Sequence, residues 1–224
     1  MSENVLIRQA EKKDFYFLAD CILSADQSNG AHSSYTQIFD VSKEAFHAIL
    51  LQMLDEELEG TELSPVHFLI AEINNIPVAA VSSWVEGAYD APSWMIRSGL
   101  FREYIPQKNI DAASSIKVIT DEMVLQRTEG TLQIEAVYTH PDYRGKGYAS
   151  MLIYDQAKRK IAEFPELKIV ELMLYLGNDA AARAYEKLGF VEKQSKICNH
   201  PDVLKYYPSL GMRLMQCDIQ KLLI

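Results

Sequence analysis

The stretch VYTHPDYRGKGYA, residues 137–149, joins two kinds of sequence pattern. An apolar, strand-like run ends at Tyr138, a turn containing proline follows, and a helical pattern starts at Gly147. The first N–H groups of a helix have no partner inside the helix, and with the helix dipole they attract anions. Glycines let a ligand approach the backbone closely, and Arg144 adds charge and paired donors. The stretch therefore predicts an anion site, with a surface turn as the alternative.

Two common phosphate-binding motifs do not occur in the sequence. Neither GxxxxGK[ST] nor GxGxxG is present. The first pattern is typical of nucleoside triphosphate sites and the second of Rossmann dinucleotide sites. The sequence therefore favours neither of these two classes of phosphate site.

The length and composition fit a globular protein. The chain has 224 residues, of which 48% are hydrophobic and 24% are charged, and this suits one large domain or two small ones. No linker rich in glycine, proline or serine divides it. We therefore expect a single domain over residues 1–224, with a helical insertion at about 88–130.

The charge balance limits the classes of partner. There are 22 basic and 31 acidic residues, which give a net charge of −9. Nucleic-acid binding needs basic patches that displace counterions, so no nucleic-acid partner is expected. The acidic surface weakly favours a cationic or neutral partner, and solubility alone is the alternative explanation.

Cysteine usage and hydropathy predict no metal site and no membrane span. The three cysteines, Cys21, Cys198 and Cys217, are widely spaced and form no CxxC pair, so a disulfide framework or four-ligand zinc site is not expected. The first residues have no apolar signal core, and no apolar run approaches the length of a membrane span. A cytoplasmic location is expected.

Hydrophobic periodicity predicts the order β-α-α-β-β, an insertion, then β-α-β-α-β-β. Helix caps are expected at Asp14, at Ser42 and at Asn178 or Asp179. A hairpin is expected around Asn74-Asn75, and residues 26–36 are predicted to be a polar loop. The expected strands are 5–8, 131–138, 168–175, 191–198 and 211–219, and the expected helices include 42–59, 93–104, 112–127 and 147–162. This mixture indicates an α/β sheet with helices on both faces.

A second stretch, LYLGNDAAARAYEKLGF at residues 174–190, adds a second motif. With the first stretch it resembles the GNAT superfamily of acyl-CoA-dependent N-acetyltransferases. The family's pyrophosphate motif [QR]-x-x-G-x-[GA] is matched by Arg144, Gly145, Lys146, Gly147, Tyr148 and Ala149. The pattern N-x-x-A-x-x-x-Y-x-x-x-G-F is matched by Asn178, Ala181, Tyr185, Gly189 and Phe190. The clear resemblance covers about residues 131–191.

The resemblance implies a fold and a mode of cofactor binding. It implies a mixed, mostly antiparallel sheet of about seven strands, with helices on both faces and the two central strands splayed apart. Pantetheine would lie in the gap and pair with the main chain of Ala136, Val137 and Tyr138. Residues 144–149 would hold the pyrophosphate, and Asn178 would contact the pantetheine arm. The cosubstrate implied is acetyl-CoA.

The resemblance also implies an acyltransferase reaction, in which an amine attacks the thioester directly in a ternary complex. Glu135 is the candidate base, acting directly or through water, because burial would raise its pKa into a useful range. The alternative is an outward-facing glutamate, since strand alternation alone does not fix its face. A main-chain N–H, that of Val137, is a candidate to stabilise the oxyanion.

Tyr185 is the candidate general acid for the departing thiolate. Ala181, Ala184 and Leu188 share its helical face, so a core tyrosine with a satisfied hydroxyl is the alternative. At the level of function, the alternative is a catalytically weak acyl-CoA-binding sensor or scaffold. The expected acceptor is a small-molecule or peptide amine, and exposed late strands leave a homodimer open.

Overall fold

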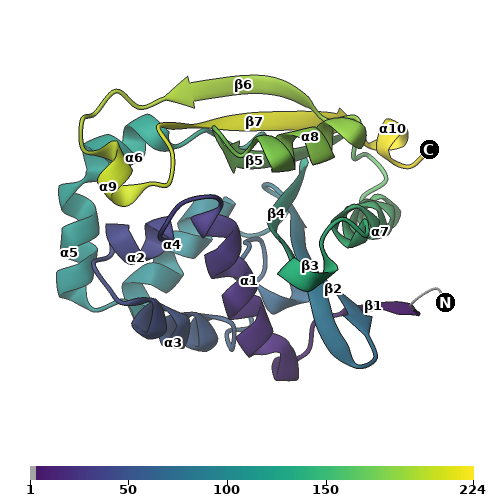
Figure 1. The fold of residues 1–224 in the computed structure, drawn as a ribbon, viewed down its shortest axis with the longest axis horizontal. Coiled ribbons are helices and arrows are strands. Elements are labelled where there is room, and N and C mark those ends of the chain that lie inside the picture. Colours follow the sequence, from purple (N-terminus) through teal and green to yellow (C-terminus); the bar gives the residue numbers. More distant parts are fainter. Residues whose placement is uncertain (1–3) are drawn as a thin grey trace.

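One seven-stranded sheet runs through residues 4–224, the part of the chain that this computed structural model describes (Figure 1). Its strand order is β1-β2-β3-β4-β5-β7-β6. All neighbouring strands are antiparallel except β4 and β5, which are parallel. The strands are β1 Val5–Gln9, β2 Phe68–Ile73, β3 Ile76–Val85, β4 Leu132–Thr139, β5 Ile169–Tyr175, β6 Val191–Ile197 and β7 Gly211–Asp218. The sheet is thus mixed and mostly antiparallel, as the family resemblance implies.

Helices cover both faces of this sheet. The α-helices are α1 Phe15–Gln27, α2 Ser34–Ile38, α3 Lys43–Met53, α4 Ser93–Tyr104, α5 Gln107–Ser115, α6 Lys117–Met123, α7 Tyr148–Glu163, α8 Asp179–Lys187, α9 Val203–Tyr206 and α10 Ile219–Leu222, and the short 3₁₀ turns are Lys12–Asp14, Pro65–His67 and Pro141–Tyr143. In Figure 1, α7 lies on one side of the central strands, and α1 to α5 lie on the other.

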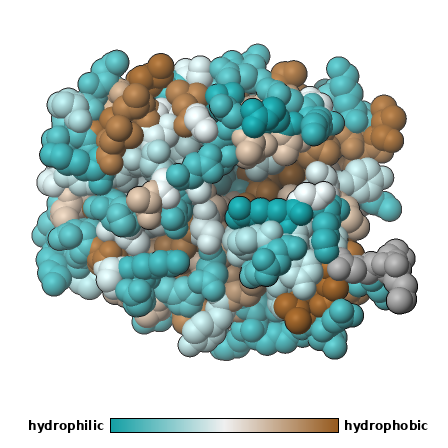
Figure 2. All heavy atoms as spheres, in the orientation of Figure 1, coloured by the Kyte–Doolittle hydropathy of each residue, from teal (hydrophilic) through white to brown (hydrophobic). Residues whose placement is uncertain are grey.

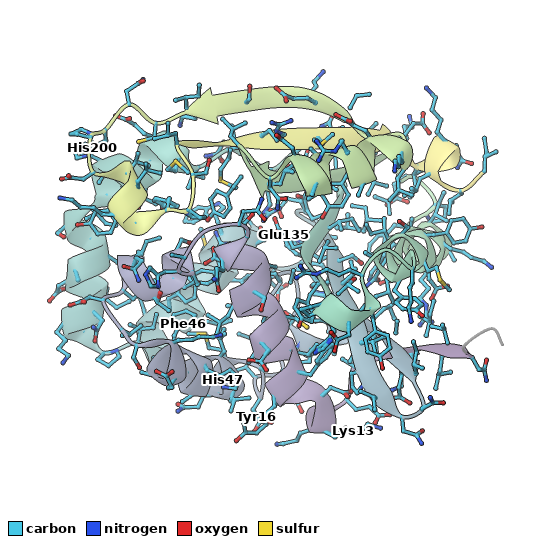
Figure 3. The ribbon with its side chains drawn as sticks, viewed as in Figure 1. Lys13, Tyr16, Phe46, His47, Glu135 and His200 are labelled. Atoms are coloured by element: carbon cyan, nitrogen blue, oxygen red, sulfur yellow. The ribbon has the colours of Figure 1, made fainter. Side chains whose placement is uncertain are left out.

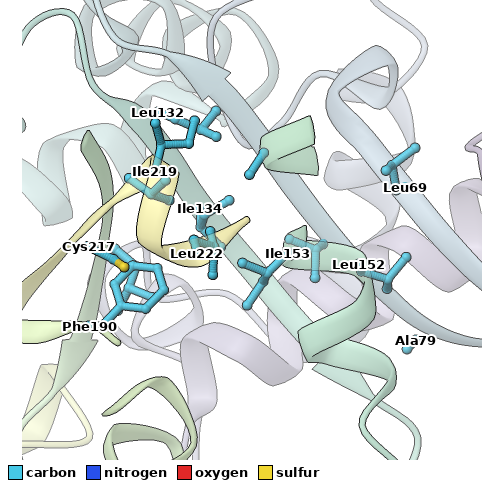
Figure 4. Close-up of a cluster of buried hydrophobic side chains, with 14 of the residues drawn as sticks. Leu69, Ala79, Leu132, Ile134, Leu152, Ile153, Phe190, Cys217, Ile219 and Leu222 are labelled. Carbon is cyan, nitrogen blue, oxygen red and sulfur yellow. The ribbon is translucent and has the colours of Figure 1, made fainter. Parts of the chain in front are cut away.

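Alternation along β2 divides the hydrophobic core between the two faces. Leu69 belongs to a cluster with Leu152 and Ile153 of α7 (Figure 4). The neighbouring Phe68 and Ile70 belong to a second cluster, which includes buried side chains of α1 and α3. Successive strand side chains point to opposite faces, so β2 is buried on both faces, and all its residues except Glu72 are apolar. The face drawn in Figure 2 is mostly hydrophilic, with apolar residues in separate groups.

The two central strands part after a short pairing. β4 and β5 pair only at Leu132–Val170, Gln133–Glu171 and Ile134–Leu172. Just beyond, Ala136 has a φ of 48°, and the register with β3 shifts between Ala80 and Ser82. Such a bulge bends a strand and ends regular pairing. The sheet is therefore splayed at its two central strands, and the backbone of residues 136–138 is not paired with β5.

Some local expectations are corrected by tertiary contacts. Asp14 precedes α1, but its carboxylate makes no cap hydrogen bond. It instead accepts from Arg8 at 2.6 and 2.8 Å. The helix predicted over 42–59 ends at Met53, and α1 and α2 both extend into the loop predicted at 26–36.

Other local expectations are confirmed. Ser42 caps α3 by accepting from the N–H of Ala45 at 3.1 Å. Asn74 and Asn75 form the hairpin turn with positive φ values of 51° and 64°. In the predicted insertion, α4 has the expected bounds, while the second helix is divided at Ile116 into α5 and α6.

Candidate active site

A cleft of about 1550 Å³ lies where β4 and β5 part. Its lining combines the second half of β4, the end of β5, the first two turns of α8, the end of α1, and parts of α4 to α6. Nine of the twelve predicted site residues line it: Glu135, Ala136, Val137, Tyr138, Arg144, Gly145, Ala149, Asn178 and Tyr185. A smaller hollow of about 590 Å³ adjoins it and is also lined by Gly147 and Tyr148.

The glycine turn before α7 has room for a ligand at its backbone. Gly145 and Gly147 have φ values of 77° and 84°, and a Cβ added to either would meet no atom within 4 Å. Gly147 is the N-cap residue of α7, so the unpaired N–H groups of the first helical turn lie directly after it. Arg144 is held beside the turn, where its Nε donates to the carbonyl of Thr139 at 3.2 Å. This geometry fits a phosphate group.

Two residues of the predicted pyrophosphate motif are placed differently from the others. Lys146 lines neither hollow, and its Nζ lies 5.0 Å from the ring centre of Tyr143. Tyr148 is only 5% exposed and packs in the core cluster beneath α7. The spacing of the motif alone could not separate a ligand-facing residue from a core residue, because that depends on how α7 is rotated against the sheet.

Asn178 joins α8 to the end of α1. Its Oδ1 accepts from the N–H of Ala181 at 3.3 Å, as expected for a helix cap. Its Nδ2 donates to the hydroxyl of Ser28 at 2.8 Å. Asn178 thus lines the cleft and fixes the distance between two of its walls.

Glu135 lies on the cleft side of β4, near the centre of the molecule (Figure 3). Arg127 donates from Nη2 to its Oε1 at 2.7 Å. The Arg127 guanidinium also lies 4.9 Å from the ring centre of Trp84 and donates to Gln133 at 2.7 Å. Burial raises the pKa of Glu135, and the charge of Arg127 opposes that rise. Of the two orientations that the sequence left open, the structure has the one that faces the cleft.

Tyr185 faces the same cleft from α8. Its ring packs against Phe190 with 6.0 Å between ring centres. Burial raises the pKa of Tyr185, and the negative charge of Glu135 adds to this rise. The hydroxyl therefore keeps its proton across the neutral range, as a general acid requires.

Sequence reasoning missed a second ion pair in the cleft, between Glu62 and Arg97. Arg97 of α4 donates from Nη1 to Glu62 Oε1 at 2.5 Å. Burial alone would raise the pKa of Glu62, but the charges of Arg97 and Arg127 lower it to about 2. Both residues lie outside the two motifs and are 35 positions apart, so no local pattern could have brought them together.

The ion pair of Glu62 predicts a pH-dependent contribution to stability. The pKa of Glu62 is lower in the folded state than the ordinary 4.5. Above pH 4.5, the ionised carboxylate therefore stabilises the fold by up to about 3 kcal/mol. This stabilisation is lost as the pH falls from 4.5 toward 2. We expect Glu62→Gln to lower the free energy of unfolding most at pH 7, and progressively less below pH 5.

Urea unfolding across this pH range checks the expectation, with the exposed Glu166→Gln as the matched control. A difference between wild type and Glu62→Gln that stays constant with pH would contradict it.

Within residues 4–224, no group of three or more His, Cys, Asp or Glu side chains is arranged to hold a metal ion. No helix of the same residues is long and apolar enough to cross a bilayer.

Comparison with known proteins supports the family resemblance. Residues 112–192 match the family model of the acetyltransferase (GNAT) domain. No curated protein matches the chain.

Solved structures with this fold include several acetyltransferases. An N-acetyltransferase from Staphylococcus aureus Mu50 aligns with a TM-score of 0.63 at 16% identity, over 94% of this chain and 99% of its own. An aminoglycoside N(6′)-acetyltransferase from Legionella pneumophila aligns with a TM-score of 0.52 at 16% identity, over 99% of this chain and 96% of its own. A chimera of the spermidine N-acetyltransferase SpeG from Vibrio cholerae and hSSAT aligns with a TM-score of 0.53 at 13% identity, over 98% of each chain. At these identities the likeness shows the fold.

Proposed function

We propose that this protein transfers an acetyl group from acetyl-CoA to a primary amine, because residues 112–192 match the family model of the GNAT acetyltransferase domain. One observation carries the proposal. A single cleft runs from the glycine turn, through the parting of β4 and β5, to Glu135 and Tyr185. This order along the cleft supports the proposal that the turn binds the pyrophosphate, that the gap holds the pantetheine arm, and that Glu135 and Tyr185 move protons at the thioester.

The residues along the cleft fit this cosubstrate. Residues 144–149 would hold the pyrophosphate, since Arg144 supplies charge and the open space at Gly145 and Gly147 lets phosphate oxygens reach the backbone. The main chain of residues 136–138, on the side that is not paired with β5, would bind the pantetheine arm. Asn178 would contact the same arm from the opposite wall, although its hydrogen bonds also cap α8.

Two side chains would move protons. Glu135, directly or through one water, takes a proton from the acceptor ammonium, because only the free amine is nucleophilic. The amine attacks the thioester carbonyl, and the N–H of Val137 is the candidate donor to the oxygen as it gains charge. The C–S bond then breaks, and Tyr185 gives its proton to the departing sulfur. The nitrogen that attacked loses its extra proton as the amide forms, and this proton restores the Tyr185 hydroxyl.

We also predict that the acceptor is a primary amine on a small molecule or a peptide, and that the protein is located in the cytoplasm. The exposed edge strand β6, with Val191 and Ile197 on its surface, is the candidate contact for a homodimer.

Calorimetric titration with acetyl-CoA tests the cosubstrate. We expect wild type to bind, and we expect Arg144→Ala with Gly147→Asp to bind about 10- to 100-fold more weakly, because the double variant removes a charged donor and places a carboxylate at the anion site. Arg159→Ala, on the exposed face of the same helix, is the matched control. No binding to wild type would refute the proposal. Binding without release of CoA in the presence of any amine would favour the sensor or scaffold alternative.

A further inference from the structure

We propose that the acceptor carries a carboxylate as well as its amine, as amino acids do, and that Arg97 binds this carboxylate. This inference rests on the proposed function, since it names the class of amine that the same cleft takes. It is based on the two ion pairs that line the cleft, Arg97–Glu62 and Arg127–Glu135, and on the charge of the more exposed member of each pair.

The two ion pairs present opposite charges to the cleft. In the first pair, the side chain of Arg97 is 29% exposed and that of Glu62 is 7% exposed. In the second pair the order is reversed, because Glu135 is 23% exposed and Arg127 is 14% exposed. A ligand therefore meets a guanidinium at one pair and a carboxylate at the other. This arrangement is complementary to a molecule with one negative and one positive group.

Arg97 has hydrogen-bond donors left for a further partner, whereas Glu62 is 7% exposed and already accepts hydrogen bonds at both oxygens. Besides Arg97, the hydroxyl of Thr61 donates to Glu62 at 2.8 Å, and that of Tyr35 lies 3.4 Å away. Within residues 4–224, the hydrogen bonds of Arg97 use only Nη1. Nε and Nη2 therefore remain as donors, and a planar guanidinium with two donors matches a carboxylate.

The acids of the cleft are poorly suited to a polycation. The carboxylate of Asp26 accepts from Ser34 Oγ at 2.6 Å, from Tyr175 at 3.2 Å, and from two donors of residues 33 and 35. Glu86 accepts from the indole of Trp84 at 2.9 Å and from a backbone N–H. Asp121 is exposed and pairs with Lys117. Among the cleft acids of residues 4–224, those left without such partners, Asp90 and Glu129, are exposed, and solvent screens their charge. Only Glu135 is both accessible and close to the predicted reaction centre.

The walls near Arg97 favour an apolar body on the acceptor. Tyr35 and Phe101 meet edge to face, with 5.8 Å between ring centres. Trp94 lies on the same helix as Arg97 and is 54% exposed. All three aromatic residues line the cleft. Aromatic surfaces of this kind contribute through burial of apolar area. An amino acid with an aromatic or long apolar side chain satisfies the charges and the walls together.

Matched acceptors test this inference through CoA release. L-Phenylalanine, its amide, 2-phenylethylamine, spermidine and an aminoglycoside would be compared, followed by other amino acids with their amides. We expect kcat/KM for the free acids to exceed that for the amides by about 10- to 100-fold, the range for a charge-assisted hydrogen bond. Arg97→Gln should remove this preference, and Arg159→Gln, at an exposed position of α7 outside the cleft, should keep it.

Arg97→Gln leaves the buried Glu62 without its partner and can therefore destabilise the fold, so a second variant is needed as a control. The double variant Arg97→Gln with Glu62→Gln removes both charges and should also lose the preference. Amides or polyamines acetylated as well as the free acids would overturn the inference, as would an unchanged preference in both variants.

A calorimetric titration separates failure of this inference from failure of the proposed function. With CoA bound, wild type is titrated with the amino acids and their amides. Equal binding of both, or binding of neither, overturns the role of Arg97 while acetyl-CoA binding still stands. Absence of acetyl-CoA binding instead overturns the proposed function.

Discussion

Tyr185→Phe is expected to lower kcat by about 10²- to 10⁴-fold, the usual contribution of a general acid. Tyr185 lines the cleft, and burial raises the pKa of its hydroxyl, so that the hydroxyl stays protonated. Without it, the thiolate departs unprotonated, so the step that breaks the C–S bond slows. Phenylalanine preserves the ring contact with Phe190. The affinity for acetyl-CoA and the unfolding temperature should therefore change little.

Steady-state CoA release, calorimetric titration with acetyl-CoA and thermal unfolding measure these three quantities. Tyr154→Phe, at an exposed position on α7, is the matched control and should keep full activity. If Tyr185→Phe lowers the unfolding temperature but leaves kcat unchanged, Tyr185 is a core residue and not the acid.

Glu135→Gln is expected to lower kcat/KM by about 10²-fold or more and to change the shape of its pH profile. In wild type the base works only after losing its proton. Burial raises the pKa of Glu135 above the ordinary 4.5, so activity should rise with pH through that higher value. Glutamine has no proton to lose, and the rising limb assigned to Glu135 should be missing from the variant. Measurement of kcat/KM between pH 5 and 9 checks both effects.

Arg127→Gln provides the matched test of that limb. The positive charge of Arg127 lowers the pKa of Glu135 against the effect of burial. Its removal should therefore move the rising limb to higher pH while the limb itself remains. A limb that keeps its position in Arg127→Gln and persists in Glu135→Gln would assign the titration to another group, and Glu135 would not be the base.

The resemblance found in the sequence holds where its signals are local. The strand, glycine turn and helix over 132–163 lie within a residue or two of the predicted bounds, because hydrophobic periodicity and glycine placement act over neighbouring residues. The same is true of the Asn178 cap and of the turn at Asn74-Asn75. The seven-stranded, splayed sheet followed from the family resemblance and not from periodicity alone.

Local rules fail where a distant residue offers a stronger partner. Asp14 has the sequence position of a helix cap, but its carboxylate accepts hydrogen bonds from Arg8 instead. Arg8 also donates to Glu72, which is 64 positions away from it. A charge-assisted pair that is largely shielded from water outweighs a single cap hydrogen bond. Nothing in the spacing of residues 8–14 predicts the contribution of Glu72.

The sequence by itself therefore determined the family resemblance, the main strands and helices, and the order of the site residues along the chain. Only the tertiary structure decided that Glu135 faces the cleft and that Tyr148 packs in the core. It also decided that Arg97 and Glu62 meet. The physical reason is that the face of a strand and the partner of a charge depend on which surfaces are brought together by packing. A pattern with a period of two or 3.6 residues carries no information about contacts between residues dozens of positions apart.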